Sequence, residues 1–216
     1  MMIIAIDGLA VNGKTTLAKM ISKKLNFKNF NTGAIYRCMA LEMINKNLDI
    51  NHIETVIEHL KNIDINFEGT KVILNGKDVS EEIRTEKISL CSNKWATNEQ
   101  IKEIVRKKQK EFISKYDTVI EGRDIGTRIA PNADIKFYLY SDFETRVNRA
   151  WNQDRTAPID KIRENIRKID DVDIYGGNFI KPQNAIEIKT DDKTIEQVYD
   201  IMMDKIMSYM GSNEKE

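Results

Sequence analysis

Hydrophobic residues follow two patterns along most of the chain. Short continuous apolar runs rich in β-branched residues indicate buried strands, which we predict at 2–6, 27–30, 118–120, 135–139 and 185–189. Apolar residues spaced three and four apart indicate amphipathic helices, which we predict over 13–25, after 33, over 98–116, from 142 and over 194–209. Strands that alternate with helices are typical of parallel sheets. The pattern therefore predicts an α/β fold, a doubly wound parallel sheet flanked by helices.

Between residues 62 and 88 the hydrophobic residues follow a third pattern, in which they recur at every second position. Apolar and polar positions alternate over 63–67 and 71–74, and two turn-forming pairs, Glu68-Gly69 and Asn75-Gly76, separate the runs. Asn-Gly is a strong signal for a tight hairpin because both residues tolerate positive φ. We predict a small antiparallel β insert at about 62–88.

The first predicted strand runs directly into a glycine-rich loop with the pattern G-x-x-x-x-G-K-T-T. Its glycines let the backbone wrap a polyphosphate, and the N-terminus of the following helix favours negative charge. Lys14 is expected to reach the β- and γ-phosphates, and Thr15 to offer its hydroxyl to Mg²⁺. We predict a nucleoside triphosphate site formed by Gly8, Leu9, Ala10, Val11, Asn12, Gly13, Lys14, Thr15 and Thr16.

Composition narrows the class of protein. The 216 residues include 34 Lys+Arg and 34 Asp+Glu, so the net charge gives no attraction to nucleic acid or anionic membranes. Cys38 and Cys91 form no Cys-x-x-Cys pair or Cys/His cluster, which argues against structural zinc and a disulfide framework. The chain opens on a predicted strand, and no apolar run reaches 18 residues. We expect a cytoplasmic monomer that binds small molecules, with no nucleic acid polymer and no membrane as partner.

Glycine-rich phosphate loops are shared by motors, GTPases and kinases. This chain is short for a motor and lacks the N-K-x-D motif that reads guanine. Its predicted strand at 118–120 ends in Glu-Gly-Arg-Asp, where a hydrolytic enzyme usually carries Asp or Asp-Glu. These features favour a small-molecule phosphotransferase, which needs a second anion pocket near the γ-phosphate.

Two segments that follow predicted strands are candidates for this second pocket. In the first, Arg37 is expected to grip an acceptor phosphate with two hydrogen bonds, and Tyr36 to pack on a sugar or base. In the second, Arg123 can meet phosphate and Asp124 can accept a hydrogen bond from a base amino group or a sugar hydroxyl. Both segments are expected at the carboxyl edge of the sheet, where α/β proteins bind ligands.

Four segments of the sequence resemble bacterial cytidylate kinase. They read I-A-I-D-G-x-x-x-x-G-K-T-T, N-T-G-A-I-Y-R, F-E-G-x-x-V-x-L-N-G-x-D-V-S-E-E-I-R-T and E-G-R-D-I-G-T. The third segment carries most weight, because adenylate and guanylate kinases have no such segment. The resemblance implies phosphorylation of CMP and dCMP to their diphosphates by MgATP.

The resemblance also implies a division of this single unit into parts. We expect a core of residues 1–61, 89–150 and 181–210, together with a mobile monophosphate-binding insert at about 62–88. A short helical lid that bears arginines is expected at about 151–180, and a tail at 211–216.

Individual residues match the family's functional positions. Acceptor binding is expected from Thr32, Tyr36, Arg37, Asn93, Lys102, Arg123 and Asp124. Asn93 and Lys102 stand where the family has a serine and an arginine, and Asn31 where it usually has an aspartate. Two arginines that flank the lid join Lys14 of the loop in stabilising the transferred group, so the expected catalytic residues are Lys14, Arg123, Arg146 and Arg149.

Residues 168–176 depart from the family's pattern. The run R-D-x-R-D-x-x-R is replaced by Lys168-Ile-Asp-Asp-Val-Asp-Ile-Tyr-Gly176, so arginines expected to hold the acceptor are missing. Either Arg155, Arg163 or Arg167 takes over, or the acceptor is another pyrimidine or a modified nucleotide.

Two further alternatives remain open at the level of sequence. A nucleotide-binding regulator without catalysis would share the phosphate loop. A shikimate-type kinase is disfavoured, because the second strand leads into Thr-Gly-Ala-Ile-Tyr-Arg rather than Asp-x-Asp.

Overall fold

The structure, a computed structural model, describes residues 1–68 and 71–213. Backbone contacts divide the chain into two compact units. The terminal unit contains residues 1–27 and 117–216, and the middle unit contains residues 28–116.

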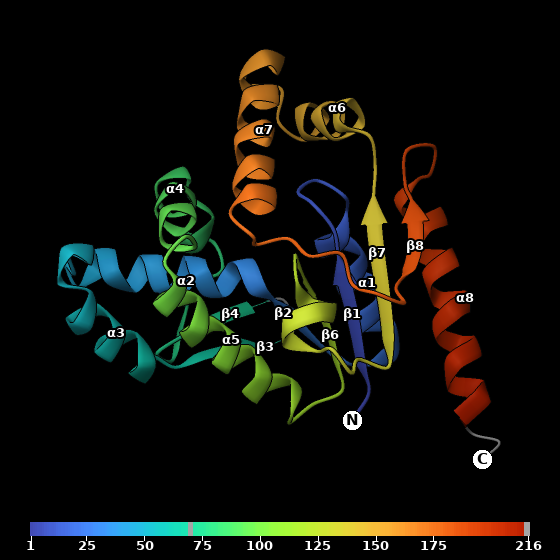
Figure 1. Cartoon of the computed structure of the whole chain (residues 1–216), viewed down its shortest axis with the longest axis horizontal. Coiled ribbons are helices and arrows are strands. Elements are labelled where there is room, and N and C mark those ends of the chain that lie inside the picture. Colours follow the sequence, from blue (N-terminus) through green and yellow to red (C-terminus); the bar gives the residue numbers. More distant parts are fainter. Residues whose placement is uncertain (69–70, 214–216) are drawn as a thin grey trace. The chain divides into compact units, whose positions relative to one another are not determined.

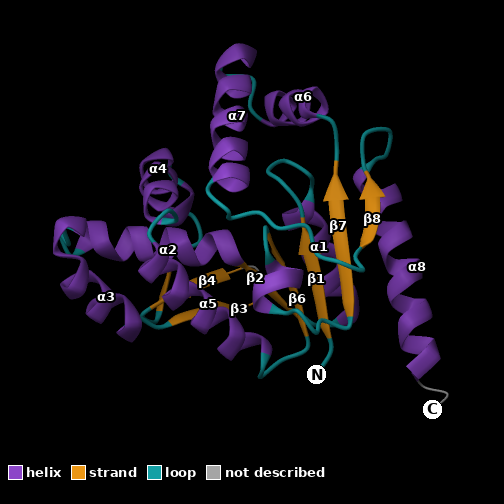
Figure 2. Ribbon diagram, in the orientation of Figure 1, coloured by secondary structure: helices purple, strands orange, loops and turns teal. Residues whose placement is uncertain are grey.

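The terminal unit is built on parallel strands in the order β6-β1-β7-β8 (Figures 1 and 2). The strands are β1 (Ile3–Asp7), β6 (Thr118–Gly122), β7 (Ile135–Tyr140) and β8 (Ile186–Lys189). In register, Ile4 of β1 stands between Val119 of β6 and Ile135 of β7. The carboxyl ends of β1, β6 and β7 therefore lie at one edge, and the loops that follow them can share a site there.

The core of this unit lies between the sheet and two helices, α1 (Lys14–Leu25) and α8 (Ile195–Asn213). Alternate residues of the strands face these helices, as the period of two requires. The strands contribute Ile4, Ile6, Val119, Ile135, Phe137, Leu139 and Ile188, and the helices contribute Leu17, Ala18, Ile21, Val198, Met202, Met203 and Ile206.

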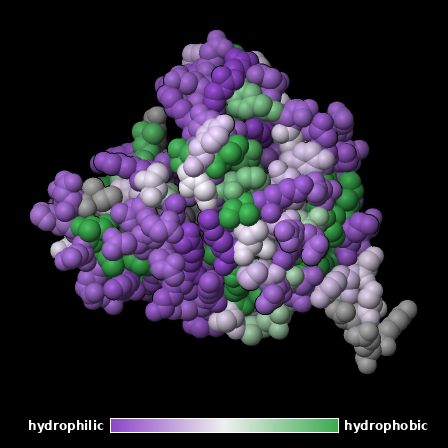
Figure 3. Space-filling model, viewed as in Figure 1, coloured by the Kyte–Doolittle hydropathy of each residue, from purple (hydrophilic) through white to green (hydrophobic). Residues whose placement is uncertain are grey.

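Two further helices, α6 (Phe143–Gln153) and α7 (Ile159–Tyr175), lie beyond the carboxyl end of β7 (Figure 1). They contact each other. Figure 3 shows mainly hydrophilic residues on the part of the surface that they form. A π-helical turn, Ile125–Ile129, connects β6 toward β7.

The middle unit combines helices with a small antiparallel sheet. Its helices are α2 (Thr32–Asn45), α3 (Ile53–Asn62), α4 (Glu86–Trp95) and α5 (Glu99–Ile113), with short 3₁₀ turns at Ile50–His52 and Glu82–Arg84. Its strands are β2 (Lys28–Asn31), β3 (Ile65–Glu68), β4 (Lys71–Leu74) and β5 (Lys77–Asp78), of which β3, β4 and β5 pair in that order. The rings of Phe30, Phe67 and Phe112 pack with centroids 4.5 to 5.9 Å apart.

The hairpin between β4 and β5 turns where the Asn-Gly pair predicts. Asn75 and Gly76 have φ values of 48° and 80°, the left-handed values that a tight primed turn requires. The other predicted turn, Glu68-Gly69, falls partly outside the described residues.

The parallel sheet, its flanking helices and the small antiparallel sheet confirm the predicted fold class. The predicted division into core, insert and lid stays a prediction.

Two elements have other boundaries than the sequence pattern predicts. Within 62–88 the paired strands end at Asp78, a 3₁₀ turn follows at Glu82–Arg84, and α4 begins at Glu86. Helix α8 continues to Asn213, past the predicted start of the tail, and the Ser212 hydroxyl donates a hydrogen bond to the Ser208 carbonyl inside it.

Among the described residues, none of the helices is long and apolar enough to cross a membrane.

Candidate nucleotide site

The glycine-rich loop lies between β1 and α1, at the carboxyl edge of the terminal unit's sheet. Gly8, Val11 and Gly13 have φ values of 152°, 61° and 79°. At Gly8 a Cβ would stand 2.2 Å from the carbonyl oxygen of Leu139 in the neighbouring strand β7, so only glycine fits. No side chain caps the N-terminus of α1, and its first turn contains no acidic residue. These features leave the start of α1 suited to a phosphate.

Lys14 is the first residue of α1 and is almost fully buried, with 5% of its surface exposed. Its Nζ donates a hydrogen bond of 2.8 Å to the Leu9 carbonyl oxygen within the same loop. Burial, followed by the nearby Arg123 guanidinium, lowers the pKa of Lys14 to about 7. A bound phosphate would supply the negative charge that this buried ammonium needs.

Asp7 closes β1 and ties the loop to the segment that follows β6. Its two carboxylate oxygens accept hydrogen bonds from the backbone N–H groups of Ile125 and Gly126, at 2.8 and 2.7 Å. Burial nevertheless raises the pKa of Asp7 to about 6, because desolvation outweighs these two hydrogen bonds. The segment that carries Arg123 and Asp124 is therefore fixed from one side by β1.

Thr15 and Glu121 place two oxygen atoms, both suitable as metal ligands, side by side next to the loop. The Thr15 hydroxyl donates to Glu121 Oε1 at 3.0 Å, and Glu121 is buried at the end of β6. A hydroxyl and a carboxylate are the oxygen ligands that Mg²⁺ takes in nucleotide sites. The residues present therefore fit the ion that the sequence predicts.

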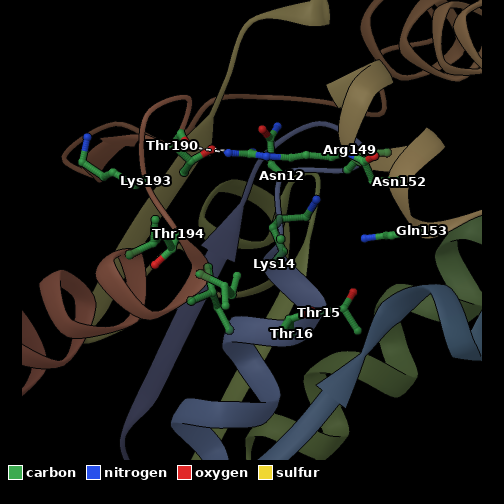
Figure 4. A pocket seen from close by; sticks show the side chains of 15 residues that line it. Asn12, Lys14, Thr15, Thr16, Arg149, Asn152, Gln153, Thr190, Lys193 and Thr194 are labelled. Carbon is green, nitrogen blue, oxygen red and sulfur yellow. Dashed lines mark hydrogen bonds between the residues drawn. The ribbon is translucent and has the colours of Figure 1, made fainter. Parts of the chain in front are cut away.

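A pocket of about 630 Å³ opens beside the phosphate loop (Figure 4). It is lined by residues 11–17 of the loop and α1, by Arg149, Asn152 and Gln153 of α6, and by Thr190, Lys193, Thr194, Ile195 and Val198. Arg149 reaches across it, where its Nη1 donates to Thr190 Oγ1 at 2.9 Å and its Nη2 donates to the Thr190 carbonyl. The volume is within the range of small-ligand sites.

The other predicted catalytic arginines of this unit are held by aspartates of α7. Arg146 forms two hydrogen bonds to Asp170, at 2.9 and 2.6 Å, and both side chains are buried. Arg123 donates from Nε to Asp173 at 2.6 Å. Sequence analysis missed this role of α7, although the carboxylates of 170–173 stood out as replacing arginines.

Asp124 also has a partner that the sequence did not reveal. It lies 3.2 Å from Arg128, one turn further along, and Arg128 in turn donates to the Gly177 carbonyl at 2.8 Å.

The three arginines considered as substitutes lie around α6 and α7. Arg167 and Arg146 both lie over the Phe143 ring, at 5.2 and 5.4 Å from its centroid. Arg163 pairs with Glu144 and Asp160, and Arg155 lies over the Trp151 ring. Arg167 is thus the one that shares a contact with a predicted catalytic arginine.

The remaining acceptor candidates belong to the middle unit. Thr32 begins α2, where Asn31 caps the helix by accepting a hydrogen bond from Ala34 N at 2.8 Å. This cap explains why asparagine can stand at a position where the family usually has aspartate. Thr32 Oγ1 accepts a hydrogen bond of 2.8 Å from the buried Gln109 of α5. Gln109 is a further residue that sequence reasoning missed.

Gly33 lies beside the Arg37 side chain, so that a Cβ at Gly33 would stand 3.6 Å from Arg37 Nη1. Lys102 of α5 is buried and pairs with Glu99 at 3.4 Å, whereas Asn93 of α4 is exposed. Helix α2, which carries Tyr36 and Arg37, contacts both α4 and α5. The middle unit thus gathers the helices that bear these candidates.

Comparison with known proteins places the chain in a family. The sequence matches the family described as cytidylate kinase over residues 4–208. The cytidylate kinase of Clostridioides difficile strain 630 is 33% identical over 211 residues, which cover 95% of this chain and 98% of that protein. The cytidylate kinase of Caldanaerobacter subterraneus subsp. tengcongensis is 35% identical over 209 residues, with 94% and 93% covered.

Among solved structures, protein TT1252 from Thermus thermophilus matches with a TM-score of 0.53 at 13% identity, over 96% of each chain, which supports the fold. The family match and the two relatives cover nearly the whole of this sequence, and they show that the chain belongs to the cytidylate kinase family.

Proposed function

We propose that this chain transfers the γ-phosphoryl group of MgATP to CMP or dCMP. Membership of the cytidylate kinase family makes it an ATP-dependent phosphotransferase. The observation that carries the proposal is the burial of Lys14 near Arg123. Lys14 belongs to the glycine-rich loop, which lines a pocket of nucleotide size. We further propose that the protein is a cytoplasmic monomer that acts only on small-molecule substrates.

The donor binds along the glycine-rich loop. The N–H groups of residues 8–16 and the ammonium of Lys14 hold the β- and γ-phosphates, and the pocket beside Arg149 and Thr190 takes the nucleoside. Thr15 and Glu121, whose side chains are hydrogen-bonded to each other, would hold Mg²⁺. When bound, Mg²⁺ neutralises the charge of the β- and γ-phosphates.

Transfer proceeds in line. An ionised phosphate oxygen of the acceptor attacks the γ-phosphorus while the bond to the β–γ bridging oxygen breaks, which leaves ADP and the acceptor diphosphate. The attacking oxygen already carries its charge, so the residues position and neutralise rather than abstract a proton. Arg123, Arg146 and Arg149 neutralise the transferring group, and Asp124 orients the acceptor.

The acceptor is held by Thr32, Tyr36 and Arg37 of α2, with Asn93 and Lys102 nearby in the same unit. Arg37 suits the acceptor phosphate because a guanidinium donates two parallel hydrogen bonds.

One observation favours a second acceptor class. The segment that departs from the family's pattern places Asp170 and Asp173 on Arg146 and Arg123, instead of adding arginines for the acceptor. Under this reading the same reaction acts on another pyrimidine monophosphate or on a modified nucleotide.

A panel of acceptors tests the proposal. ADP formation from MgATP would be measured with CMP, dCMP, UMP, AMP, GMP and shikimate at equal concentrations. We expect CMP and dCMP to give the highest kcat/KM. A preference for UMP would support the second acceptor class, and no ADP with any acceptor would overturn both readings.

A further inference from the structure

Helix α7 carries two aspartates, three residues apart, that each hold an arginine of the proposed transfer group. Asp170 holds Arg146 of α6, and Asp173 holds Arg123, which follows β6. Residues three apart lie on the same face of a helix. One helix face therefore provides the carboxylate partner for two arginines from different elements.

The two ion pairs differ in geometry. Asp170 accepts hydrogen bonds from both terminal amino groups of Arg146, so it takes the end of the guanidinium that would grip a phosphate. Asp173 accepts from Nε of Arg123 at 2.6 Å. A guanidinium has five N–H donors, and four of them belong to the terminal amino groups. Contact at Nε fixes the direction of the Arg123 side chain without using the end that binds phosphate in a bidentate way.

The backbone around Arg123 is tied to the same segment. The N–H of Ile180 donates to the Arg123 carbonyl at 3.3 Å, and Arg128 donates to the Gly177 carbonyl at 2.8 Å. Together with the Asp173 contact, these bonds join residues 123–128 to residues 173–180 at three points. The position of Arg123 therefore depends on the C-terminal end of α7.

Asp173 is itself held in place and lies near the phosphate loop. Its carbonyl oxygen accepts hydrogen bonds from the N–H groups of Asn178 and Phe179, at 2.9 and 2.8 Å. Its side chain is 13% exposed and that of Arg123 is 27% exposed, so the pair is partly shielded from water. Arg123 lowers the pKa of Lys14 and Asp173 raises it, because both charges act on the buried ammonium.

We propose that Asp173 is a positioning residue for Arg123, holding its guanidinium through Nε so that the terminal amino groups face the phosphoryl group in transfer. This inference rests on the proposed function. Asp173 also offsets part of the repulsion between Arg123 and Lys14, which lets two cations stand at one site.

A double-mutant cycle on kcat tests this role. We expect Asp173→Ala to lower kcat by about tenfold to a hundredfold, with KM for ATP changed less than about threefold, since a misplaced catalytic group costs rate. Arg123→Ala should lower kcat further, and the double variant should match Arg123→Ala alone. Asp173→Asn, which keeps an oxygen that can accept from Nε, should lie between wild type and Asp173→Ala.

Glu164→Gln is the matched control, because Glu164 is an exposed carboxylate of the same helix that pairs with Lys168 at 2.6 Å. It should leave kcat unchanged. Full activity of Asp173→Ala would overturn the proposal, as would an equal loss from Asp173→Ala in the wild-type and Arg123→Ala backgrounds. If Asp173→Ala does not fold by circular dichroism, the same cycle is run with Asp173→Asn.

Wild-type protein in the same assay distinguishes failure of the proposed function from failure of the role proposed for Asp173. If it forms no ADP with any acceptor, the proposed function fails, and the cycle is read from the Kd of a non-hydrolysable ATP analogue with an imido bridge between the β- and γ-phosphates. Coupling between the two substitutions in that Kd supports the role of Asp173, and independent effects overturn it.

Discussion

At the residue scale, the central feature is a lysine whose charge is disfavoured until a phosphate arrives. The fold buries Lys14 beside Arg123, and its Nζ donates to the loop's own Leu9 carbonyl. A neutral hydrogen-bond acceptor compensates a buried ammonium less well than an anion does. A bound phosphate removes this penalty, and the relief adds to the free energy of nucleotide binding.

The lowered pKa of Lys14 predicts proton uptake on nucleotide binding. Above pH 7 the free protein holds this amine largely neutral, and a bound phosphate raises its pKa, so ADP should bind with uptake of a proton. Between pH 7.5 and 9 we expect Kd for ADP to rise, approaching tenfold per pH unit. Calorimetry in two buffers of different ionisation enthalpy measures the uptake.

Stability follows the opposite trend, because the unfolded chain keeps the ordinary pKa of 10.5. Between about pH 7 and 10.5 the unfolded state binds more protons, so the contribution of Lys14 to stability increases as pH rises.

Lys14→Met is the control for the binding experiment, since any proton uptake that this variant retains belongs to the nucleotide. Binding by wild type without proton uptake would contradict the assignment.

Two glycines give a matched pair of substitutions. Gly8→Ala places a Cβ 2.2 Å from the Leu139 carbonyl oxygen at a φ of 152°, and should destabilise the protein by about 3 kcal/mol or more. Gly211→Ala meets nothing within 4 Å in helix α8, and should be neutral or stabilise by up to about 1 kcal/mol. Urea unfolding compares the two, and equal stabilities would show that β7 does not constrain the loop.

At the element scale, α6 and α7 are joined by a buried ion pair. Arg146 and Asp170 are 5% and 10% exposed in their side chains. Asp170→Ala leaves a buried guanidinium unpaired and should cost about 3–5 kcal/mol of unfolding free energy. Replacing both partners, as Arg146→Met with Asp170→Leu, should recover most of that stability but not the activity. A single variant as stable as wild type in urea would refute this account.

The elements that sequence analysis located are those with local signals. The strand before Gly8, the helix after Gly13 and the Asn75-Gly76 turn each follow from a few adjacent residues, and the structure confirms them. Helix α4 was missed because its buried face includes the polar Ser92, while Leu90 of the same helix is 65% exposed. Tertiary packing, rather than periodicity, decides such a segment.

The partners of the candidate arginines could not be predicted, because they are distant in sequence. Asp170 and Asp173 lie 24 and 50 residues from Arg146 and Arg123. A carboxylate in the sequence does not specify which cation it meets. The sequence therefore predicts which cations surround the phosphate loop, but not what holds each of them.

At the scale of the whole molecule, the proposed reaction assigns donor binding to the terminal unit and most of acceptor binding to the middle unit. Substitutions in the two units should then affect different kinetic constants. Arg37→Ala should raise KM for CMP about thirtyfold or more, because charged hydrogen bonds to a phosphate are lost, and should leave the Kd for ATP within about twofold.

Arg84→Ala is the matched control for that substitution. Arg84 is an exposed arginine of the same unit, whose Nε donates to the Ser80 carbonyl at 3.1 Å. Initial rates over a range of CMP concentrations compare the two variants. An unchanged KM for CMP in Arg37→Ala would remove Arg37 from the acceptor site.

The central claim, group transfer from ATP to a pyrimidine monophosphate at Lys14, is tested most directly by the stoichiometry of products. CDP and ADP would be quantified by chromatography after incubation of the protein with MgATP and CMP. We predict one CDP for each ADP, little ADP without CMP, and a loss of several orders of magnitude in both products for folded Lys14→Ala. ADP release without CDP, or full activity of Lys14→Ala, would contradict the account.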